Sequence, residues 1–510
     1  MIEDKCNKQR IARNTIFLYI RLVIILIVSL YTVRVVLRAL GVVDYGIYNV
    51  VGGFASMFGF FCTTMSTATQ RFYNFEIGKK GYDSVKRVFN SSIRIQLFFS
   101  FIVFVLGELL GVWYINHKLV VPETRLMVAN WVYQFSLYSL IFTIIQIPYL
   151  AAIMAFEKMN FYAIVGIVDA FLKLFIAIII TYTSIDKLLL YVFLLFIISV
   201  INFVLYRSYC KRNIPFIQLE KPYDLKLVKK MLSFSVWNLF GTFSYMMRNQ
   251  GLNVLINAFF GAVINSASGI AGQVSGALQT FTSNIVIAFK PQLTQSYARE
   301  EYLSTKKLFF VMSKVSYALV LVLGVPVILE MNYILCLWLG EGIPEYTVSF
   351  SRLTILSMLI SVLHTPIVQV VHATGKIKKF QILTSLMILS ILPTSWVCLR
   401  TGMSPNSVYW VTILVFMLNQ ILGLWLLHKS FQYQYIEYIK TVLLPCLGFT
   451  VLLIIIPTVT LILMSESFIR LFTICFESLF LGIIGAMCII LNREERKNFI
   501  NLTMNLFKRI

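Results

Sequence analysis

Fourteen segments of the chain are each long and apolar enough to cross a lipid bilayer. A spanning helix needs about 20 mostly apolar residues. The segments lie at 14–33, 43–66, 90–116, 126–150, 160–182, 188–206, 232–253, 263–288, 308–330, 347–371, 379–399, 406–427, 441–463 and 471–491. The chain is 59% hydrophobic and only 13% charged, whereas soluble proteins carry about 25% charged residues. The sequence therefore predicts an all-α polytopic membrane protein of about 14 transmembrane helices.

Lys and Arg residues are distributed unevenly between the two sides of such a membrane protein. If the N-terminus is cytoplasmic, most of the 44 Lys and Arg residues fall in cytoplasmic segments. The outer segments hold only Arg34, Arg38, Lys118, Arg125, Lys187, Arg400 and Arg470. This bias is typical of cytoplasmic loops and sets the orientation, so we expect both termini in the cytoplasm. It also explains the net charge of +22 without a nucleic-acid partner.

The segments between the predicted spans are too short to bury a core, so we expect function to lie among the helices. The eight cysteines show neither CxxC nor Cys/His ligand spacing, and no disulfide framework or metal site is predicted. Nucleophile-elbow and phosphate-loop motifs are also absent from the sequence. We therefore predict no cofactor and no enzymatic activity, with energy supplied by ion or lipid gradients.

The two halves of the chain resemble one another. A shift of about 220 residues places "LRALGVVDYGIYNVVGGF" (37–54) on "INAFFGAVINSASGIAGQV" (256–274), with Gly41 on Gly261. An even number of spans separates the copies, so they share one orientation, as in the parallel repeats of some transporters. Chance similarity is the alternative. We expect six-helix bundles at 1–210 and 232–430, a cytoplasmic linker at 211–231, and two additional transmembrane helices with a cytoplasmic tail at 431–510.

The second, seventh and eighth segments are polar for membrane spans. Their amides and hydroxyls include Asn49 in the second, Asn238, Tyr245, Asn249 and Asn253 in the seventh, and Gln279 in the eighth. Small residues such as Ser268, Gly272 and Gly276 are also explained by close helix packing. A stripe of amides is better explained by a wet cavity. We predict that these polar residues line a water-filled lumen.

Six basic residues lie inside the predicted spans, and each needs a reason to be there. They are Arg21, Arg94, Lys173, Arg248, Lys314 and Arg352. A basic residue at mid-span costs about 2.5–3.5 kcal/mol on insertion scales. Arg21 lies roughly 11 Å inside its span at 1.5 Å per residue, which is a long reach for snorkelling. Snorkelling is the stronger alternative for Arg94, Lys314 and Arg352, which lie nearer span ends.

The acidic residues Asp169, Glu108 and Glu477 also lie well inside spans. Asp169 and Lys173 are four residues apart and share a helix face. They form either a self-neutralising pair or a site for cation coupling or cargo. Glu108 and Glu477 have no obvious local partner in the sequence, so either is a candidate for carrying a proton.

Six stretches resemble a bacterial polysaccharide (O-antigen-type) flippase of the multidrug/oligosaccharidyl-lipid/polysaccharide (MOP) exporter superfamily. They are "LYTVRVVLRALGVVDYGIYNVVGGF" (30–54), "STATQRF" (66–72), "WNLFGTFSYMMRNQGLNVLINAFFG" (237–261), "AFKPQLTQSYA" (288–298), "ILCLWLG" (334–340) and "ATGKIKKFQ" (373–381). The resemblance spans nearly the whole chain. It implies two six-helix bundles forming a V, alternating access, and residence in the bacterial cytoplasmic membrane. It also implies a cargo of oligosaccharide on undecaprenyl pyrophosphate, moved from the inner to the outer leaflet.

The basic residues within the spans suit the pyrophosphate of that cargo, because a guanidinium can donate two parallel hydrogen bonds to phosphate. We predict that Arg21 binds it, assisted by Arg248. Glycan-assembly proteins are further expected partners, and coupling to H⁺ or Na⁺ stays open. A multidrug or cation exporter, or a peptidoglycan-precursor flippase, would share the fold. A membrane glycan polymerase or ligase is a rival of another class, but such enzymes usually need a sizeable outer loop.

Overall fold

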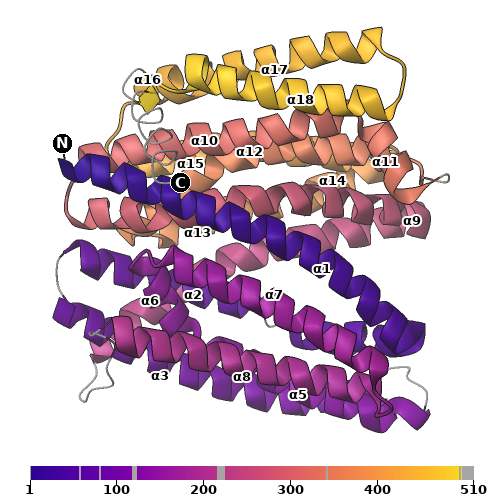
Figure 1. The fold of residues 1–510 in the computed structure, drawn as a ribbon. Coiled ribbons are helices and arrows are strands. Elements are labelled where there is room, and N and C mark those ends of the chain that lie inside the picture. The colour runs from indigo at the N-terminus through magenta and orange to yellow at the C-terminus, as the bar shows by residue number, and fades with distance from the viewer. Residues whose placement is uncertain are drawn as a thin grey trace. The chain divides into compact units, whose positions relative to one another are not determined.

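The computed structural model describes residues 2–56, 59–79, 82–117, 123–214, 217, 224–340, 343–492 and 495–496. Within them every regular element is helical (Figure 1). The first half contains α1 (Ile2–Ser56), α2 (Gly59–Gly78), α3 (Tyr82–Leu106), α4 (Val112–His117), α5 (Leu126–Ile145), α6 (Ile147–Ala155), α7 (Met159–Tyr182) and α8 (Lys187–Asn213). The second contains α9 (Leu225–Ala298), α10 (Tyr302–Leu329), α11 (Met331–Leu339), α12 (Thr347–Thr374), α13 (Lys378–Leu389), α14 (Ile391–Arg400), α15 (Ser407–Ser430), α16 (Tyr435–Tyr438), α17 (Leu444–Leu463) and α18 (Phe468–Gly485).

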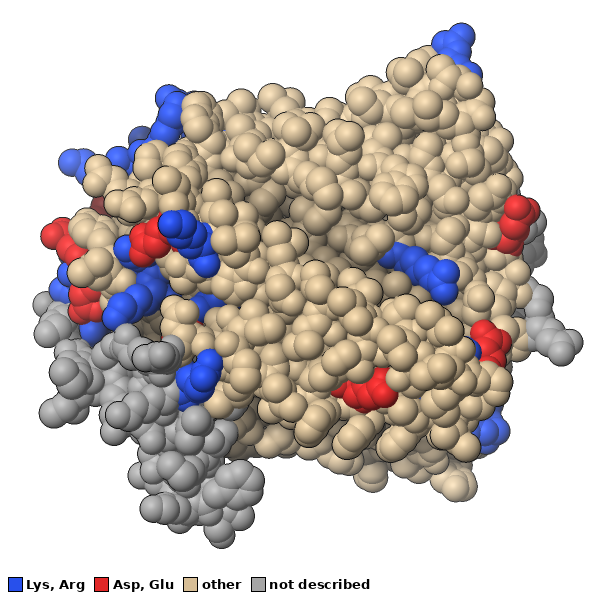
Figure 2. Space-filling view, turned by 90° about the horizontal axis from the view of Figure 1, so that it is seen from above, with Lys and Arg blue, Asp and Glu red and all other residues tan. Residues whose placement is uncertain are grey.

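Eleven helices in the described part of the chain are long and apolar enough to span a membrane. They coincide with eleven of the fourteen predicted spans. The other three predicted spans, the polar second, seventh and eighth, are also helical and lie in α1, α2 and α9. On the face drawn in Figure 2, uncharged residues cover the middle and most Lys and Arg side chains lie toward one end. The all-α polytopic fold is confirmed.

The chain forms two compact units. The N-terminal unit holds Asn14–Leu239, and the C-terminal unit holds the described residues from Phe240 onward together with those before Asn14. The change from one unit to the other falls inside α9, not in the predicted linker at 211–231, much of which lies outside the described residues. The predicted domain boundaries therefore stay predictions.

The long helices α1 and α9 each break at one glycine. Gly41 has φ 76° and ψ 171°, and Gly261 has φ 79° and ψ −176°. Backbone in this region is open essentially only to glycine. These are the two glycines that a shift of about 220 residues superposes. Chance similarity would not place the same rare conformation at both, so the kinks support the parallel repeat.

The units also repeat their helix contacts. In the N-terminal unit α3 packs on α5, and α5 packs on α8; in the C-terminal unit α10 packs on α12, and α12 packs on α15. These helices are the third, fourth and sixth spans of each half. Ala129, Tyr133 and Leu137 of α5 are fully buried in this packing, and the Tyr133 hydroxyl donates to the Gly107 carbonyl at 2.7 Å.

Alanine at either kink glycine should destabilise the protein. No heavy atom lies within 4 Å of a Cβ built on Gly41 or Gly261, so the cost comes from the backbone alone, about 1–3 kcal/mol. Gly272 also has open space around a Cβ but lies in regular helix. Thermal unfolding of the purified protein should therefore rank Gly41→Ala and Gly261→Ala below wild type, with Gly272→Ala at least as stable as wild type, because alanine favours regular helix over glycine. Equal stability of all three variants would contradict this account.

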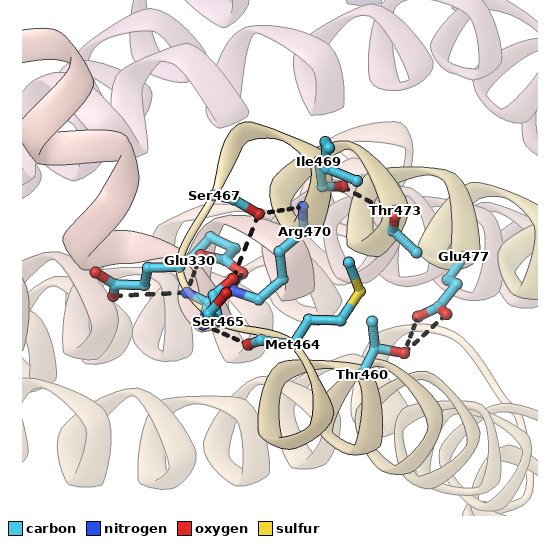
Figure 3. Close-up of polar contacts among 10 residues, drawn as sticks. Glu330, Thr460, Met464, Ser465, Ser467, Ile469, Arg470, Thr473 and Glu477 are labelled. Atoms are coloured by element: carbon cyan, nitrogen blue, oxygen red, sulfur yellow. Dashed lines mark hydrogen bonds and ion pairs between the residues drawn. The ribbon is translucent and has the colours of Figure 1, made fainter.

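The two additional helices pack against α10. Helices α17 and α18 lie side by side and both contact α10 (Figure 1). The Arg470 guanidinium of α18 binds Glu330 at the end of α10 through two hydrogen bonds, of 2.6 and 2.8 Å, and donates to the Met464 carbonyl at 3.1 Å (Figure 3). Lys314 Nζ lies 2.6 Å from Glu495 Oε2. Lys314 and Glu330 are about 24 Å apart along α10 at 1.5 Å per residue, so ion pairs fasten the hairpin at two distant points.

Candidate functional site

Arg21, the most deeply placed predicted arginine, lies on α1 and contacts α7. Its Cζ is 4.3 Å from the centroid of the Tyr162 ring. A Cβ on Gly166 would lie 2.3 Å from the Arg21 Nε, so the missing side chain of Gly166 lets the guanidinium lie against the α7 backbone. The Arg21 Nε is buried and has no hydrogen-bond partner in the described residues. The side chain is therefore held by an aromatic ring and helix backbone, with donor capacity unused.

An acidic residue lies further along the same face of α7. Asp169 Oδ2 is 2.8 Å from Lys173 Nζ, and Asp169 Oδ1 accepts a hydrogen bond of 2.8 Å from Asn202 of α8. The predicted pairing of Asp169 with Lys173 is present, and both carboxylate oxygens are engaged.

We call Arg21, Tyr162, Asp169, Lys173 and Asn202 the Arg21 cluster. Sequence reasoning missed Tyr162 and Asn202. Tyr162 lies four residues before Gly166 and seven before Asp169, so helical spacing from Asp169 was the available signal. Asn202 offered only its polarity within an apolar span. Its pairing with α7 depends on how two helices pack, which no local spacing reveals.

The C-terminal unit holds a second arginine in a comparable setting. The Cζ of Arg248, on α9, lies 5.0 Å from the Phe416 ring centroid of α15 and 5.9 Å from the Tyr245 ring. Arg248 donates to the amide oxygen of Asn249, and its Nε is buried without a partner in the described residues. Each unit therefore presents an arginine of its first repeat helix against an aromatic ring.

Hydrogen bonds link both halves of α9 to α15. The Tyr409 hydroxyl donates to Ser268 Oγ at 3.0 Å, and Ser268 Oγ donates to Asn253 Oδ1 at 3.2 Å. We call Arg248, Asn249, Asn253, Ser268 and Tyr409 the Arg248 cluster.

The predicted lumen residues fall into two groups. Asn238 is buried and donates to the Thr64 carbonyl of α2 at 3.5 Å, so it takes part in helix packing. Tyr245, Asn249 and Gln279 are exposed, as residues lining a wet space would be. The side chain of Asn49 lies outside the described residues. The lumen itself stays a prediction.

The glycines of the eighth span do not serve close packing among the described residues. A Cβ built on Gly269, Gly272 or Gly276 meets no atom within 4 Å. Small residues that allow helices to approach would show close neighbours there. Of the two interpretations of this stripe, open space is therefore the better supported within the C-terminal unit.

The remaining predicted basic residues have different surroundings. Lys314 has no exposed side-chain surface and forms an ion pair with Glu495. Arg352 Nε donates to the Ile328 carbonyl at 2.9 Å. Arg94 is half-buried on α3. Lys314 thus has its own counter-charge, and we do not carry it forward as a headgroup ligand.

Both isolated acidic residues find partners on neighbouring helices. Gln134 Nε2 donates to Glu108 Oε2 at 3.0 Å. Thr460 of α17 donates to Glu477 of α18, with oxygen–oxygen distances of 2.8 and 2.9 Å (Figure 3). The sequence showed no partner for either because both partners come from another helix. Both partners are neutral, so a role in carrying protons stays a prediction.

An ion cluster at the predicted outer ends of three spans was missed altogether. Arg125, just before α5, hydrogen-bonds to both oxygens of Asp44 and to Asp186, the N-cap of α8. Burial alone would raise the pKa of Asp186, but hydrogen bonds from the Leu189 amide and from Arg125 lower it below its usual value. Sequence reasoning counted Arg125 only as an outer charge, without a partner, and so overlooked this cluster.

This cluster should make stability fall in acid. Because the pKa of Asp186 is lower in the folded state, its contribution is present above the unfolded pKa of about 3.9. It is lost as pH falls through the folded pKa. Asp186→Asn should therefore lower the unfolding temperature at neutral pH. The unfolding temperature of this variant should also fall less than that of wild type as the pH is lowered. Glu301→Gln, which removes an exposed carboxylate 3.9 Å from Arg299, should leave this pH dependence unchanged. If the unfolding temperature of Asp186→Asn fell in acid as much as that of wild type, Asp186 would not be the source of the acid sensitivity.

Comparison with known proteins places the fold. No protein-family model matches the chain, and no curated protein sequence matches it. A crystal structure of MATE in the straight conformation has a TM-score of 0.71 at 13% identity, covering 83% of this chain and 96% of that one. An outward-facing multidrug resistance MATE family transporter of the MOP superfamily has a TM-score of 0.73 at 10% identity, with 84% and 97% covered.

This chain shares the fold of these MATE transporters. A MOP superfamily transporter from Pyrococcus furiosus, whose binding pocket is described as having reverse polarity, also matches. Its TM-score is 0.69 at 11% identity, with 83% of this chain and 95% of that one covered. Identities this low establish the shared fold alone. The fold expected from the sequence is thus confirmed, and membership of the superfamily and the polysaccharide-flippase subtype stay predictions.

Proposed function

We propose that this chain is a flippase that moves an oligosaccharide on a polyprenyl pyrophosphate from the inner to the outer leaflet by alternating access. We place it in the bacterial cytoplasmic membrane with both termini in the cytoplasm. One observation carries the proposal. Among the described side chains no carboxylate pairs with Arg21, on a helix long and apolar enough to span a membrane, or with Arg248, in the predicted seventh span within α9.

A permanent cation in a low-dielectric setting calls for a counter-charge. The pyrophosphate of a lipid-linked glycan supplies one, and the planar fork of arginine matches phosphate oxygens. The membrane potential, negative inside, favours outward movement of an anion by about 2.3 kcal/mol per charge per 100 mV. Two cationic clusters, one in each unit, therefore suit an anionic headgroup that travels outward.

A multidrug or cation exporter is the principal rival, because the structural neighbours include a multidrug resistance transporter. Such an exporter would need an acidic group free to meet a cationic drug. Asp169 is engaged by Lys173 and Asn202, which favours anionic cargo. The Pyrococcus relative, described as having a pocket of reverse polarity and a different function, shows that one fold accommodates different pocket charges. Coupling to H⁺ or Na⁺, through Glu108 or Glu477, belongs to either function.

The test is complementation. A bacterium lacking its polysaccharide flippase should regain surface polysaccharide when it expresses this chain, and a drug-sensitive strain expressing it should still accumulate ethidium. Ethidium export without restored polysaccharide would instead establish the exporter. Restoration of lipid II translocation in a strain lacking its own peptidoglycan flippase would identify that cargo. A membrane polymerase or ligase would lengthen or transfer glycan without moving it.

A further inference from the structure

A cavity of about 750 Å³ opens in the C-terminal unit where α12 begins. We call it the α12 pocket; it is lined by Asn332 of α11, residues 343–349, Arg352 and Leu353 of α12, and Asn406 and Trp410 of α15. We propose that the α12 pocket binds saccharide, with a preference for sugars that carry a carboxylate or another anionic substituent. This inference rests on the proposed function, in which the predicted orientation places the pocket on the outer side.

Donor groups without a protein partner lie in the pocket wall. Arg352 Nε is fixed by its hydrogen bond to the Ile328 carbonyl at 2.9 Å, and its two terminal nitrogens donate to no described residue. Asn406 Oδ1 accepts from Ser349 Oγ at 2.8 Å, which leaves the Asn406 amide N–H groups available. Ligand sites typically combine a few placed polar groups of this kind with apolar walls.

An aromatic surface adjoins these donors. Trp410 of α15 is 56% exposed and lines the pocket. The electron-rich face of an indole attracts polarised C–H groups, which a sugar ring presents on one face. Trp410 can therefore hold the ring while amides and the guanidinium meet its hydroxyl or carboxylate groups.

The backbone at the pocket is strained. Tyr346 precedes α12 with φ 68°, a conformation that costs a bulky residue about 1–3 kcal/mol and that clusters at ligand sites. The Tyr346 ring stacks on Phe350 at 5.7 Å, and Thr347 Oγ1 donates to the Pro344 carbonyl at 2.6 Å. These contacts hold the turn that precedes α12 in the pocket wall.

Electrostatics select an anion at one end of the pocket. Its charged lining residues are Arg352 and Glu345. Glu345 is exposed and suited to accept bonds from sugar hydroxyls. Arg352 and the positive end of α12 both favour negative charge. An anionic lipid headgroup would contact these two groups but not Trp410 or Asn406. A saccharide would contact all of them, so it explains more of the residues that line the pocket.

Direct binding to the full chain in phosphatidylcholine nanodiscs tests the inference. The probes are a glucuronate-containing tetrasaccharide and the neutral chitotetraose, titrated by calorimetry. Wild type should bind the acidic probe more tightly. Arg352→Gln and Trp410→Leu should each weaken it by about tenfold or more. Arg400 and Trp396 form an arginine–tryptophan pair at 5.0 Å on α14, outside the pocket, so Arg400→Gln and Trp396→Leu are matched controls that should not change binding.

Three results would overturn the inference. They are no saturable binding of either probe by wild type, equal binding by Arg352→Gln, or equal loss in the α14 controls. Binding of glycerophosphoglycerol that depends on Arg352 but not on Trp410, without binding of the tetrasaccharide, would make the pocket a lipid-headgroup site instead. Restored polysaccharide without saccharide binding would reject only this pocket. Saccharide binding without restored polysaccharide would reject only the flippase function.

Discussion

Replacing Arg21 by alanine is expected to abolish transport while leaving the protein inserted in the membrane. Arg21 contributes no ion pair to the described structure, so its removal breaks little packing beyond its contact with Tyr162. If it binds pyrophosphate, its loss removes charge-assisted hydrogen bonds that a neutral residue cannot replace. Arg21→Lys keeps the charge but loses the fork, so partial activity is expected. The measurement is surface polysaccharide in the complemented strain at matched membrane protein levels.

Two further variants separate the role of Arg21 from a general need for charge on α1. Arg34→Ala removes an exposed arginine from the same helix and should leave transport intact. Gly166→Ala keeps the Arg21 charge but places a methyl group 2.3 Å from the present position of its Nε. The guanidinium must then shift, so reduced transport is expected. Full activity of Arg21→Ala would exclude an essential role, and equal loss in Arg34→Ala would point to insertion or orientation instead.

Local patterns in the sequence were enough for the elements and for contacts within one helix. Apolar length located the spans, eleven of which coincide with apolar helices of membrane-spanning length in the described residues. The pairing of Gly41 with Gly261 was found from similarity alone, because a conformation open only to glycine leaves a recognisable residue at both positions. The contact between Asp169 and Lys173 follows from their spacing of four residues.

Contacts between helices were beyond such patterns. Asn202 reaches Asp169 across 33 residues of sequence, and Glu495 reaches Lys314 across 181. The residues next to Asn202 and Glu495 in the sequence give no sign that these two side chains bind another helix. Arg125 was counted as an ordinary outer charge, yet packing brings it between two carboxylates. For the candidate site, the arginines could therefore be predicted from the sequence. The aromatic rings and the helix backbone that surround them became known only from the structure.

Removing Arg470 should be the most destabilising single change considered for this protein. The Glu330 side chain has no exposed surface and Arg470 is 8% exposed, and the two are joined by paired hydrogen bonds (Figure 3). Arg470→Met would leave Glu330 buried without its counter-charge, at a cost of about 3–5 kcal/mol. Because Arg470 also donates to the Met464 carbonyl, the loss should loosen α18 from α10 first. Hydrogen exchange should therefore rise in α17 and α18 before the rest of the C-terminal unit, along with a lower unfolding temperature.

A double variant shows whether the uncompensated charge is the cause. Replacing a buried ion pair by apolar residues of similar size is often neutral or stabilising, so Glu330→Leu combined with Arg470→Met should recover most of the stability lost by Arg470→Met. Arg87→Ala is the control, since Arg87 and Asp224 are exposed and 4.0 Å apart, and exposed pairs contribute roughly 0–1 kcal/mol. If the double variant were as unstable as Arg470→Met, the loss would come from packing or from the bond to Met464. Ion pairing would then not be what holds the two additional helices against α10.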